Sequence, residues 1–379
     1  MKKGEGYMNK NTRLFNAYIF LTTFARSLIE VFIGTFLYKI GFSLQEVLLY
    51  YVLVTGFSTI IAIPCFYICK RYSNKLLSVI GIITLFALQL VLDTITKKTY
   101  YLYIIALLYA IYRRSYWIAR RYYTLQVIDD KKNISKKYSF VSIANQLGAI
   151  IASYIGALLL QNFSLSIINI ISFILLGISV FILYKLDSKQ EKNDAKLDLI
   201  GTIKTIPISS IIGISCYSLQ VVISNLFPLF IIIYVKDTYT AVGFISVLTS
   251  ISSLVFTYIY GRLINKNKNY LKLSVLLYVI LQALRINTQG IMLIIVTILI
   301  GFVTKMYEQS FQKEHILLSK NFELNNYNYA FETIQNIVRL ILMLFLCIFI
   351  SDVKIMLYIT LILISISGFI TFSTKQKNT

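Results

Sequence analysis

Long apolar segments recur along nearly the whole chain and are separated by short polar ones. Each has about 20 residues or more, which is enough for a helix to cross a hydrocarbon core of roughly 30 Å. The pattern therefore predicts an all-α polytopic membrane protein. The twelve predicted transmembrane helices cover residues 15–37, 45–69, 75–94, 99–120, 139–161, 164–185, 205–235, 240–261, 270–288, 290–311, 329–350 and 354–373.

One longer polar segment, KLDSKQEKNDAKLDLIGTIK (185–204), lies between the sixth and seventh predicted helices. Its mixed charge is typical of a solvated linker. We therefore predict an N-terminal six-helix half over 1–185, a cytoplasmic linker over 186–204 and a C-terminal six-helix half over 205–379.

The net charge of +21 is explained by its distribution along the chain. When residues within three positions of a predicted helix end are counted with the adjacent loop, 26 of the 37 Lys and Arg residues lie in the termini and loops on one side of the predicted helices, 6 on the other side and 5 within the helices. This is the positive-inside bias, and it predicts that both termini are cytoplasmic in a multi-pass protein of the cell membrane. The charge is thus assigned to topology and anionic lipid headgroups, with no nucleic-acid partner.

The residues that most often bind metals are sparse. Cys65 and Cys69 are four residues apart, but no His or acidic residue accompanies them, so we expect small buried side chains. His315 lies in a predicted cytoplasmic loop and supports no site. No metal, no cofactor and no enzymatic constellation is predicted.

Two basic loops occupy matching positions in the predicted halves. KRYSNKLLSVIG (70–81) follows the second helix and GRLINKNKNYLKL (261–273) follows the eighth, and in each an arginine, Arg71 or Arg262, precedes Lys75 or Lys266 by four residues. The sequence here resembles the major facilitator superfamily, whose members carry an Asp-Arg pair in both loops. The Asp is missing from both copies. The resemblance implies two six-helix halves that rock around a central site, with these four residues in gating loops.

The fifth predicted helix carries small residues four apart. Gly148, Ala152-Ser153 and Gly156-Ala157 match the spacing of a motif in the superfamily's proton-driven exporters, although the motif's proline is absent. Small residues at this spacing also let two helix backbones approach closely. A general helix-packing face is therefore the competing interpretation.

Charged residues inside the predicted helices are the best indicators of function, because such charges usually face a bundle interior or an aqueous cavity. The resemblance implies that the first, fourth, seventh and tenth helices line that cavity, and most of these charges lie on them. The five basic and three acidic residues leave an excess of two positive charges, which favours an anionic or zwitterionic substrate. They are Arg26, Arg113, Arg114, Lys305, Arg339, Glu30, Glu308 and Glu332.

The candidate roles follow from depth and spacing. Arg26 and Glu30 lie at i and i+4, so they can pair, and a purely structural ion pair is an open alternative. Glu30 is the first candidate for proton coupling, followed by Glu308 and Glu332, either of which can also be structural. Lys305 binds substrate or extends to the interface. The predicted substrate-binding residues are Arg26, Tyr109, Arg113, Tyr116, Gln220, Asn225 and Lys305.

The stretch from Tyr109 to Tyr123 contains four arginines. Arg120 and Arg121 lie at the predicted cytoplasmic end and are interpreted as topology anchors. Arg113 and Arg114 are deeper and, being adjacent, point about 100° apart on a helix. We predict that Arg113 faces the cavity with Tyr109 and Tyr116, while the other arginine packs against a neighbouring helix; packing is the alternative role for the aromatic residues.

These observations favour a secondary active transporter, monomeric in the lipid bilayer, that exports a small amphipathic or anionic compound in exchange for protons. The alternatives are a flippase for a lipid-linked anionic molecule, uptake of an organic anion, and a membrane immunity or binding protein that keeps the transporter fold without transport. The missing loop aspartates keep the last alternative open.

Overall fold

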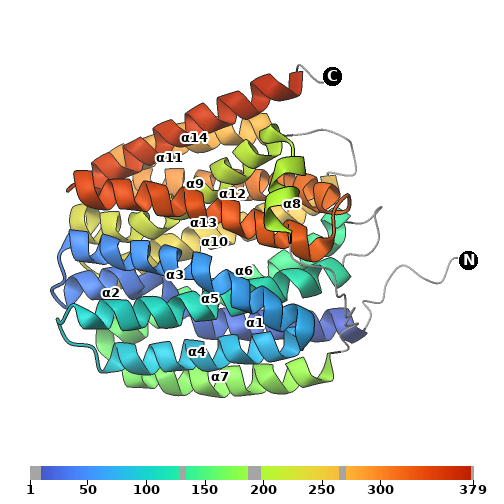
Figure 1. The fold of residues 1–379 in the computed structure, drawn as a ribbon. Helices are drawn as coiled ribbons and strands as arrows, with labels where there is room; N and C mark the ends of the chain where they lie inside the picture. Colours follow the sequence, from blue (N-terminus) through green and yellow to red (C-terminus); the bar gives the residue numbers. More distant parts are fainter. Residues whose placement is uncertain (1–9, 128–133, 187–197, 264–269, 377–379) are drawn as a thin grey trace, which may run out of the picture.

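The computed structural model describes residues 10–127, 134–186, 198–263 and 270–376, and all twelve predicted spans are helical in it (Figure 1). Predicted and observed helix ends mostly agree within a few residues. The bounds are α1 (Lys10–Ser27), η1 (Glu30–Phe32), α2 (Ile33–Lys39), α3 (Leu44–Arg71), α4 (Asn74–Asp93), α5 (Tyr100–Val127), α6 (Ile134–Asn162), α7 (Leu165–Lys185), α8 (Leu199–Thr205), α9 (Ile208–Phe230), η3 (Ile231–Val235), α10 (Tyr239–Leu263), α11 (Leu271–Asn287), α12 (Gly290–Ser319), α13 (Leu324–Phe349) and α14 (Val353–Gln376).

Ten helical segments in the described part of the chain are long and apolar enough to cross a membrane, judged by length and composition. The other two predicted spans correspond to α5 and α11. Helix α5 carries four arginines, and α11 has only 17 residues. Both helices run alongside the ten (Figure 1), so the bundle has the predicted all-α polytopic architecture.

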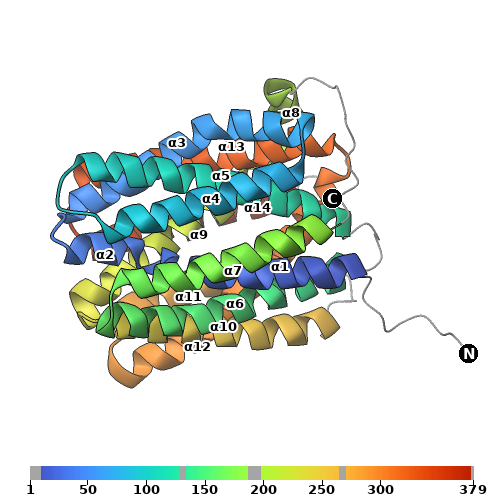
Figure 2. The ribbon, with the colours of Figure 1, turned by 90° about the horizontal axis from the view of Figure 1, so that it is seen from below.

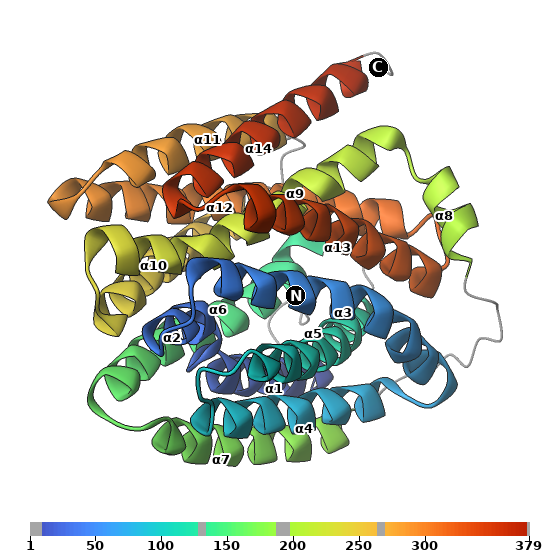
Figure 3. The ribbon, with the colours of Figure 1, turned by 60° about the vertical axis from the view of Figure 1, so that its left-hand side comes forward.

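The bundle has two sides that meet along a long interface. Figure 3 shows α1 to α7 on one side and α9 to α14 on the other. Across the interface α6 packs on α10 and α3 packs on α13. The start of α1 and the end of α14 lie at the same end of the bundle (Figures 1 and 2), which we call the inner end; the opposite end is the outer end.

The small residues of α6 form a packing face, as the second interpretation of that motif requires. A Cβ atom added to Gly148 would lie 2.7 Å from the backbone oxygen of Phe20, and one added to Gly156 would lie 2.1 Å from that of Leu28, both on or just after α1. On the α10 side, a Cβ on Gly243 would lie 2.4 Å from the Cβ of Ala157. The small residues therefore allow α1 and α10 to approach α6 closely.

The first predicted span is not a continuous helix, contrary to the prediction for 15–37. Helix α1 ends at Ser27, and a 3-10 turn over Glu30–Phe32 joins it to α2. The turn is held by i+3 hydrogen bonds, from the Ile29 N–H to the Arg26 carbonyl (3.3 Å) and from the Phe32 N–H to the Ile29 carbonyl (2.8 Å). Such a tightening in mid-helix often marks a functional hinge.

Two further expectations need correction at the inner end. Helix α12 continues to Ser319, so His315 lies in a helix, not in a loop, and its buried Nδ1 is 2.8 Å from the Tyr327 hydroxyl. The predicted linker contains α8, whose start is held by a hydrogen bond from the Asp198 N–H to Asn326 Oδ1 (3.3 Å). Residues 187–197 of that linker lie outside the described residues.

Candidate functional site

The first charged pair joins the break in the first span to α5. Arg26 Nε lies 2.8 Å from Glu30 Oε2, as the i, i+4 spacing suggested, and the Tyr109 hydroxyl donates to the other carboxylate oxygen. The Arg26 guanidinium also stacks over Tyr116 and Trp117, with its Cζ 5.3 and 5.4 Å from the ring centroids. The pair is thus enclosed by aromatic side chains from α5.

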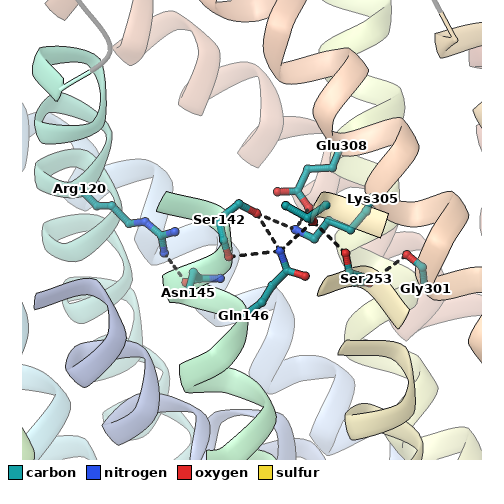
Figure 4. A network of polar contacts seen from close by, with 9 residues as sticks. Arg120, Ser142, Asn145, Gln146, Ser253, Gly301, Lys305 and Glu308 are labelled. Carbon is teal, nitrogen blue, oxygen red and sulfur yellow. Dashed lines mark hydrogen bonds and ion pairs between the residues drawn. The ribbon is translucent and has the colours of Figure 1, made fainter. Parts of the chain in front are cut away.

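The second pair lies between the two halves near the inner end. Lys305 Nζ is 2.6 Å from Glu308 Oε2 and donates to Ser142 Oγ of α6 at 3.4 Å (Figure 4). The Gln146 amide beside it donates to Ser142 Oγ (2.9 Å) and to Thr257 Oγ1 of α10 (3.1 Å). Lys305 is buried, so its side chain stays inside the protein and does not extend to the interface.

The third carboxylate, Glu332 of α13, is bound by two arginines of α5. Arg114 Nη1 contacts Glu332 Oε2, and Arg121 Nη1 lies 2.8 Å from Glu332 Oε1. Arg114, which is 1% exposed, also donates to Asn336 Oδ1, so it is the member of the adjacent pair that packs against a neighbouring helix. This group joins the two halves of the bundle.

Arg120 and Arg121, interpreted as topology anchors, both also bind protein groups. Arg121 pairs with Glu332, and Arg120 Nη1 donates to Asn145 Oδ1 of α6 at 2.7 Å (Figure 4). The same oxygen accepts from Thr23 Oγ1 of α1 at 2.9 Å. Arginine reaches such inward partners readily because its long side chain carries five N–H donors.

Among the five basic residues that were predicted to lie deep in the spans, two are left without a carboxylate. Within the described residues, neither Arg113 nor Arg339 forms an ion pair. Arg113 is half-buried, whereas Arg339 is buried and donates to Ser218 Oγ (3.0 Å) and Gln335 Oε1 (2.6 Å). The positive charge of Arg113, on α5, acts unfavourably on Arg339, on α13. Within the predicted set of eight charges, the excess of two is therefore carried by Arg113 and Arg339; Arg121, which shares Glu332, and Arg285 add positive charge outside that set.

An aromatic row runs along α5 beside the charged groups. The ring centroids of Tyr109 and Tyr112 are 5.9 Å apart, those of Tyr112 and Tyr116 are 5.8 Å apart, and those of Tyr116 and Trp117 are 5.4 Å apart. Tyr50 of α3 extends the row, 6.4 Å from Tyr109. The row could face the apolar part of an amphipathic molecule, and it also packs the N-terminal half.

The predicted residues of the seventh span lie on α9. Gln220 is buried, and its Nε2 atom has no hydrogen-bond acceptor among the described residues. The Asn225 carbonyl accepts from the Tyr51 hydroxyl at 3.4 Å, a contact between α9 and α3. Asn225 therefore lies at a contact between the halves.

The basic loops are separate from these charged groups. Arg71 is exposed and lies against the Tyr72 ring, and Lys75 Nζ donates to the Tyr184 carbonyl at the end of α7 (3.1 Å). Arg262 lies in the last turn of α10, with a side chain outside the described part, and Lys266 lies outside the described residues. Arg71 is the last residue of α3 and Lys75 the second residue of α4, so both lie in helix ends beside the loop that joins these helices.

Arg285 of α11 is a buried arginine. It lies near the predicted end of the span 270–288 and was therefore counted with the adjacent loop. Its Nε donates to Thr297 Oγ1 (3.2 Å), its Nη2 to Thr249 Oγ1 (3.4 Å), and its Cζ lies 3.6 Å from the Phe227 ring centroid. The signal for burial is Gln282, also buried and three residues earlier on the same helix face. No group of three or more His, Cys, Asp or Glu residues in the described part is arranged to hold a metal ion.

Comparison with known proteins assigns the sequence to a family. Residues 16–312 match the Major Facilitator Superfamily. A search of curated protein sequences finds no significant match. Among solved structures, a mutant of the nucleoside transporter NupG is similar with a TM-score of 0.68 and 12% identity, covering 96% of this chain and 99% of that one. A bacterial homologue of the iron transporter ferroportin in an outward-facing state gives 0.67 and 12%, covering 97% and 100%. At these identities the two structures show a shared fold.

Proposed function

This chain belongs to the major facilitator superfamily, a family of transporters and not of enzymes, and we propose that it exports a small amphipathic anion in exchange for protons. That it is a secondary transporter follows from the family; the cargo, the direction and the coupling ion are the proposal. The cell membrane, cytoplasmic termini, a monomeric state and halves divided at 1–185, 186–204 and 205–379 belong to the same proposal.

The charge balance between the halves is the observation that carries the anionic cargo. Glu30, Glu308 and Glu332 are each bound to a basic side chain. After these pairs are formed, Arg113 and Arg339 have no carboxylate partner in the described part of the chain. Charges within a bilayer are costly unless they are compensated, so an anionic cargo is the partner that the site lacks.

Alternating access is supported by polar contacts between the halves at both ends of the bundle. At the outer end, Lys39 Nζ of α2 lies 3.0 Å from Asp237 Oδ1, before α10, and 3.1 Å from the Asp237 carbonyl. At the inner end, the Arg121–Glu332 pair and the Lys305–Ser142 hydrogen bond cross the interface. Each set has to break for the corresponding end to open.

Glu30 is the best candidate for proton coupling. It lies in the 3-10 turn between α1 and α2, and its carboxylate holds Arg26 and accepts from Tyr109. Protonation would release Arg26 from the pair and add its charge to the anion site. Glu308 is paired with Lys305, and Glu332 is held by Arg114 and Arg121, so we place them second and third.

The alternatives rest on specific features. A flippase for a lipid-linked anionic molecule is supported by the same arginines together with the aromatic row of α5. A non-transporting immunity or binding protein is supported by the absence of the superfamily's aspartate from both basic loops. Uptake would need the same site and the opposite direction.

The test is transport by the full chain in proteoliposomes. We expect an aromatic monoanion to move only when a pH gradient is applied, and Glu30→Gln to abolish the dependence on that gradient. Glu46→Gln, in the exposed capping box at the start of α3, is the matched control and should transport like the wild type. If no solute moves with or without a gradient, the carrier proposal fails; if Glu30→Gln keeps full coupling, Glu30 has no such role.

A further inference from the structure

We infer that Arg113 and Arg339 together bind one anionic group of the cargo, a carboxylate, phosphate or sulfonate, so that the cargo itself joins the two halves. This inference rests on the proposed function and makes it specific. Arg113 belongs to α5 of the N-terminal half and Arg339 to α13 of the C-terminal half. A group bound to both therefore spans the interface between them.

Like charge is the first argument. The positive charge of Arg113 acts unfavourably on Arg339 and on its neighbour Arg114. In the described part of the chain, no carboxylate forms an ion pair with Arg113 to offset this repulsion. Glu332 is near enough to attract Arg339, but its two oxygens are occupied by Arg114 and Arg121. Arg339 and Arg114 are buried and Arg113 is half-buried, so repulsion among them is screened less than in water, and a bound anion would replace it with attraction.

The position of Arg339 is fixed by its neighbours, which is the second argument. Its Nε donates to Ser218 Oγ and its Nη2 to Gln335 Oε1, while Ser218 donates in turn to the Gln335 carbonyl (2.7 Å). These bonds use two of the five N–H donors of a guanidinium. The remaining donors are held in a defined orientation, which suits bidentate recognition of an oxyanion.

Unused donors beside Arg339 are the third argument. Gln335 and Asn336 are 3% and 0% exposed, yet neither Gln335 Nε2 nor Asn336 Nδ2 has an acceptor among the described residues. Their carbonyl oxygens are bound by Arg339 and Arg114, so the amide groups cannot simply turn around. Buried donors without acceptors are costly, and the oxygen atoms of an anion would satisfy them.

Arg285 provides an internal comparison. It is buried and has no ion pair in the described part, as for Arg339, but its partners Thr249, Thr297 and Phe227 all belong to the C-terminal half. It therefore cannot join the halves. Arg285→Gln is the matched control for Arg339→Gln, because both remove one buried guanidinium.

The first experiment needs no ligand. In the purified full chain, Arg339→Glu would place a carboxylate near Arg113, so we expect a higher unfolding temperature than for Arg339→Gln. In an Arg113→Gln background this difference should shrink. An equal difference in both backgrounds, or no difference in either, would show that the two positions do not interact and would overturn the inference.

The second experiment uses matched probes, naphthalene-1-sulfonate and the neutral naphthalene-1-sulfonamide, with benzoate and inorganic sulfate as further anions. We expect the sulfonate to raise the unfolding temperature of the wild type and the sulfonamide not to. Arg113→Gln and Arg339→Gln should each weaken the apparent affinity about tenfold or more, because each removes a charge-assisted hydrogen bond. Arg285→Gln should stay close to the wild type. Equal effects of the charged and neutral probes, equal loss in all three variants, or no effect of any anion would contradict the site.

The same measurement in nanodiscs identifies the source of the anionic group. If phosphatidylglycerol raises stability over phosphatidylcholine in an Arg339-dependent way, the group belongs to a lipid; otherwise it belongs to a soluble molecule. The outcomes also separate the site from the proposed function. Arginine-dependent binding without transport would refute the carrier and keep the site, whereas transport unaffected by either arginine would refute the site and keep the carrier.

Discussion

Glu332 is the carboxylate most enclosed by arginines, with Arg114 on one oxygen and Arg121 on the other. Both arginines come from α5, so the Glu332 side chain of α13 forms ion pairs with two positions of one helix in the opposite half. Removing one member of a buried ion pair leaves an uncompensated buried charge. The resulting loss of stability is larger than the net stabilisation that the pair provides.

We therefore expect Glu332→Gln to lower the free energy of unfolding by about 3 kcal/mol. Arg114, 1% exposed, would keep its charge with only Asn336 to bind it. Unfolding of the full chain in detergent, followed by circular dichroism, measures the change. Glu46→Gln, at an exposed helix start, should change stability little. Equal stability of the two variants would mean that the Glu332 pairs contribute nothing.

The spacing of residues along the sequence predicted the contacts between residues one helical turn apart, such as Arg26 with Glu30. It also separated the environments of Arg113 and Arg114, because adjacent residues on a helix point in different directions. The partners of Arg121 and the burial of Arg285 could not be predicted from spacing. Those contacts come from helices far apart in the sequence, and their geometry exists only after the helices pack.

At the scale of elements, the closeness of α6 to its neighbours depends on residues without large side chains. Gly156 lies against the Leu28 backbone, where the chain leaves α1. Backbone atoms cannot move aside as the end of a flexible side chain can. This contact also lies directly beside the 3-10 turn that carries Glu30.

We expect Gly156→Ala to destabilise the protein by about 1–3 kcal/mol, the usual cost of overpacking a core. The added Cβ would lie 2.1 Å from the Leu28 oxygen, so α1 or α6 has to shift. Gly177→Ala on α7 is the control, because nothing lies within 4 Å of its Cβ position, and a helix favours Ala over Gly. Unfolding temperatures of the two variants test this; a loss as large in Gly177→Ala would contradict it.

The start of α14 is stabilised by an ionised side chain at the outer end. Tyr234 donates to Asp352 Oδ2 at 2.6 Å, and the N–H groups of Lys354 and Ile355 donate to Oδ1 at 2.7 and 3.1 Å. The Tyr234 hydroxyl, followed by these backbone donors, holds the pKa of Asp352 below its usual value. A lowered pKa in the folded state adds stability above the unfolded pKa, about 3.9, and this stability is lost as pH falls through the folded pKa.

We therefore expect Tyr234→Phe to be less stable than the wild type at neutral pH and to lose less stability below about pH 4. Unfolding temperatures measured from neutral pH downward test this. Tyr67→Phe, an exposed tyrosine on α3, should follow the wild type. Parallel curves for Tyr234→Phe and the wild type would show that the hydroxyl does not act on Asp352.

Helix number and most helix ends could be predicted, because the length of apolar segments reflects the thickness of a bilayer. The break at Glu30–Phe32 could not be predicted, since no proline or glycine lies in residues 27–33 to mark it. Helix α8 and the inner extension of α12 were also missed. Their sequences are short and mix polar with apolar residues, and contacts with α13 favour their helical form.

At the scale of the whole molecule, the two ends of the interface are held differently. The inner end has buried charged contacts, whereas Asp237 of the outer pair is 73% exposed on its side chain. Exposed ion pairs contribute roughly 0–1 kcal/mol. The outer end should therefore open more readily than the inner end.

We expect Lys39→Gln to favour outer opening by up to about fivefold, because it removes both the ion pair and the bond to the Asp237 carbonyl. Spin labels at the exposed outer positions Lys98 and Ser351, in a chain without its native cysteines, report the populations as a distance distribution. Lys97→Gln makes the same charge change at the same end and should leave the distribution unchanged. If it shifts as much, net charge is the cause and the Lys39 contacts are not.

The unpaired charges of Arg113 and Arg339 also have an electrical consequence. Moving one elementary charge across 100 mV is worth about 2.3 kcal/mol. A monoanion would neutralise one of these two charges and a dianion both. The effect of the membrane potential on the loaded protein therefore depends on the charge of its cargo. Export of an anion from a negative-inside cell would then draw energy from the membrane potential as well as from protons. Currents recorded under potassium diffusion potentials of opposite sign measure that dependence, and identical rates at both signs would show that the transport cycle is electrically silent.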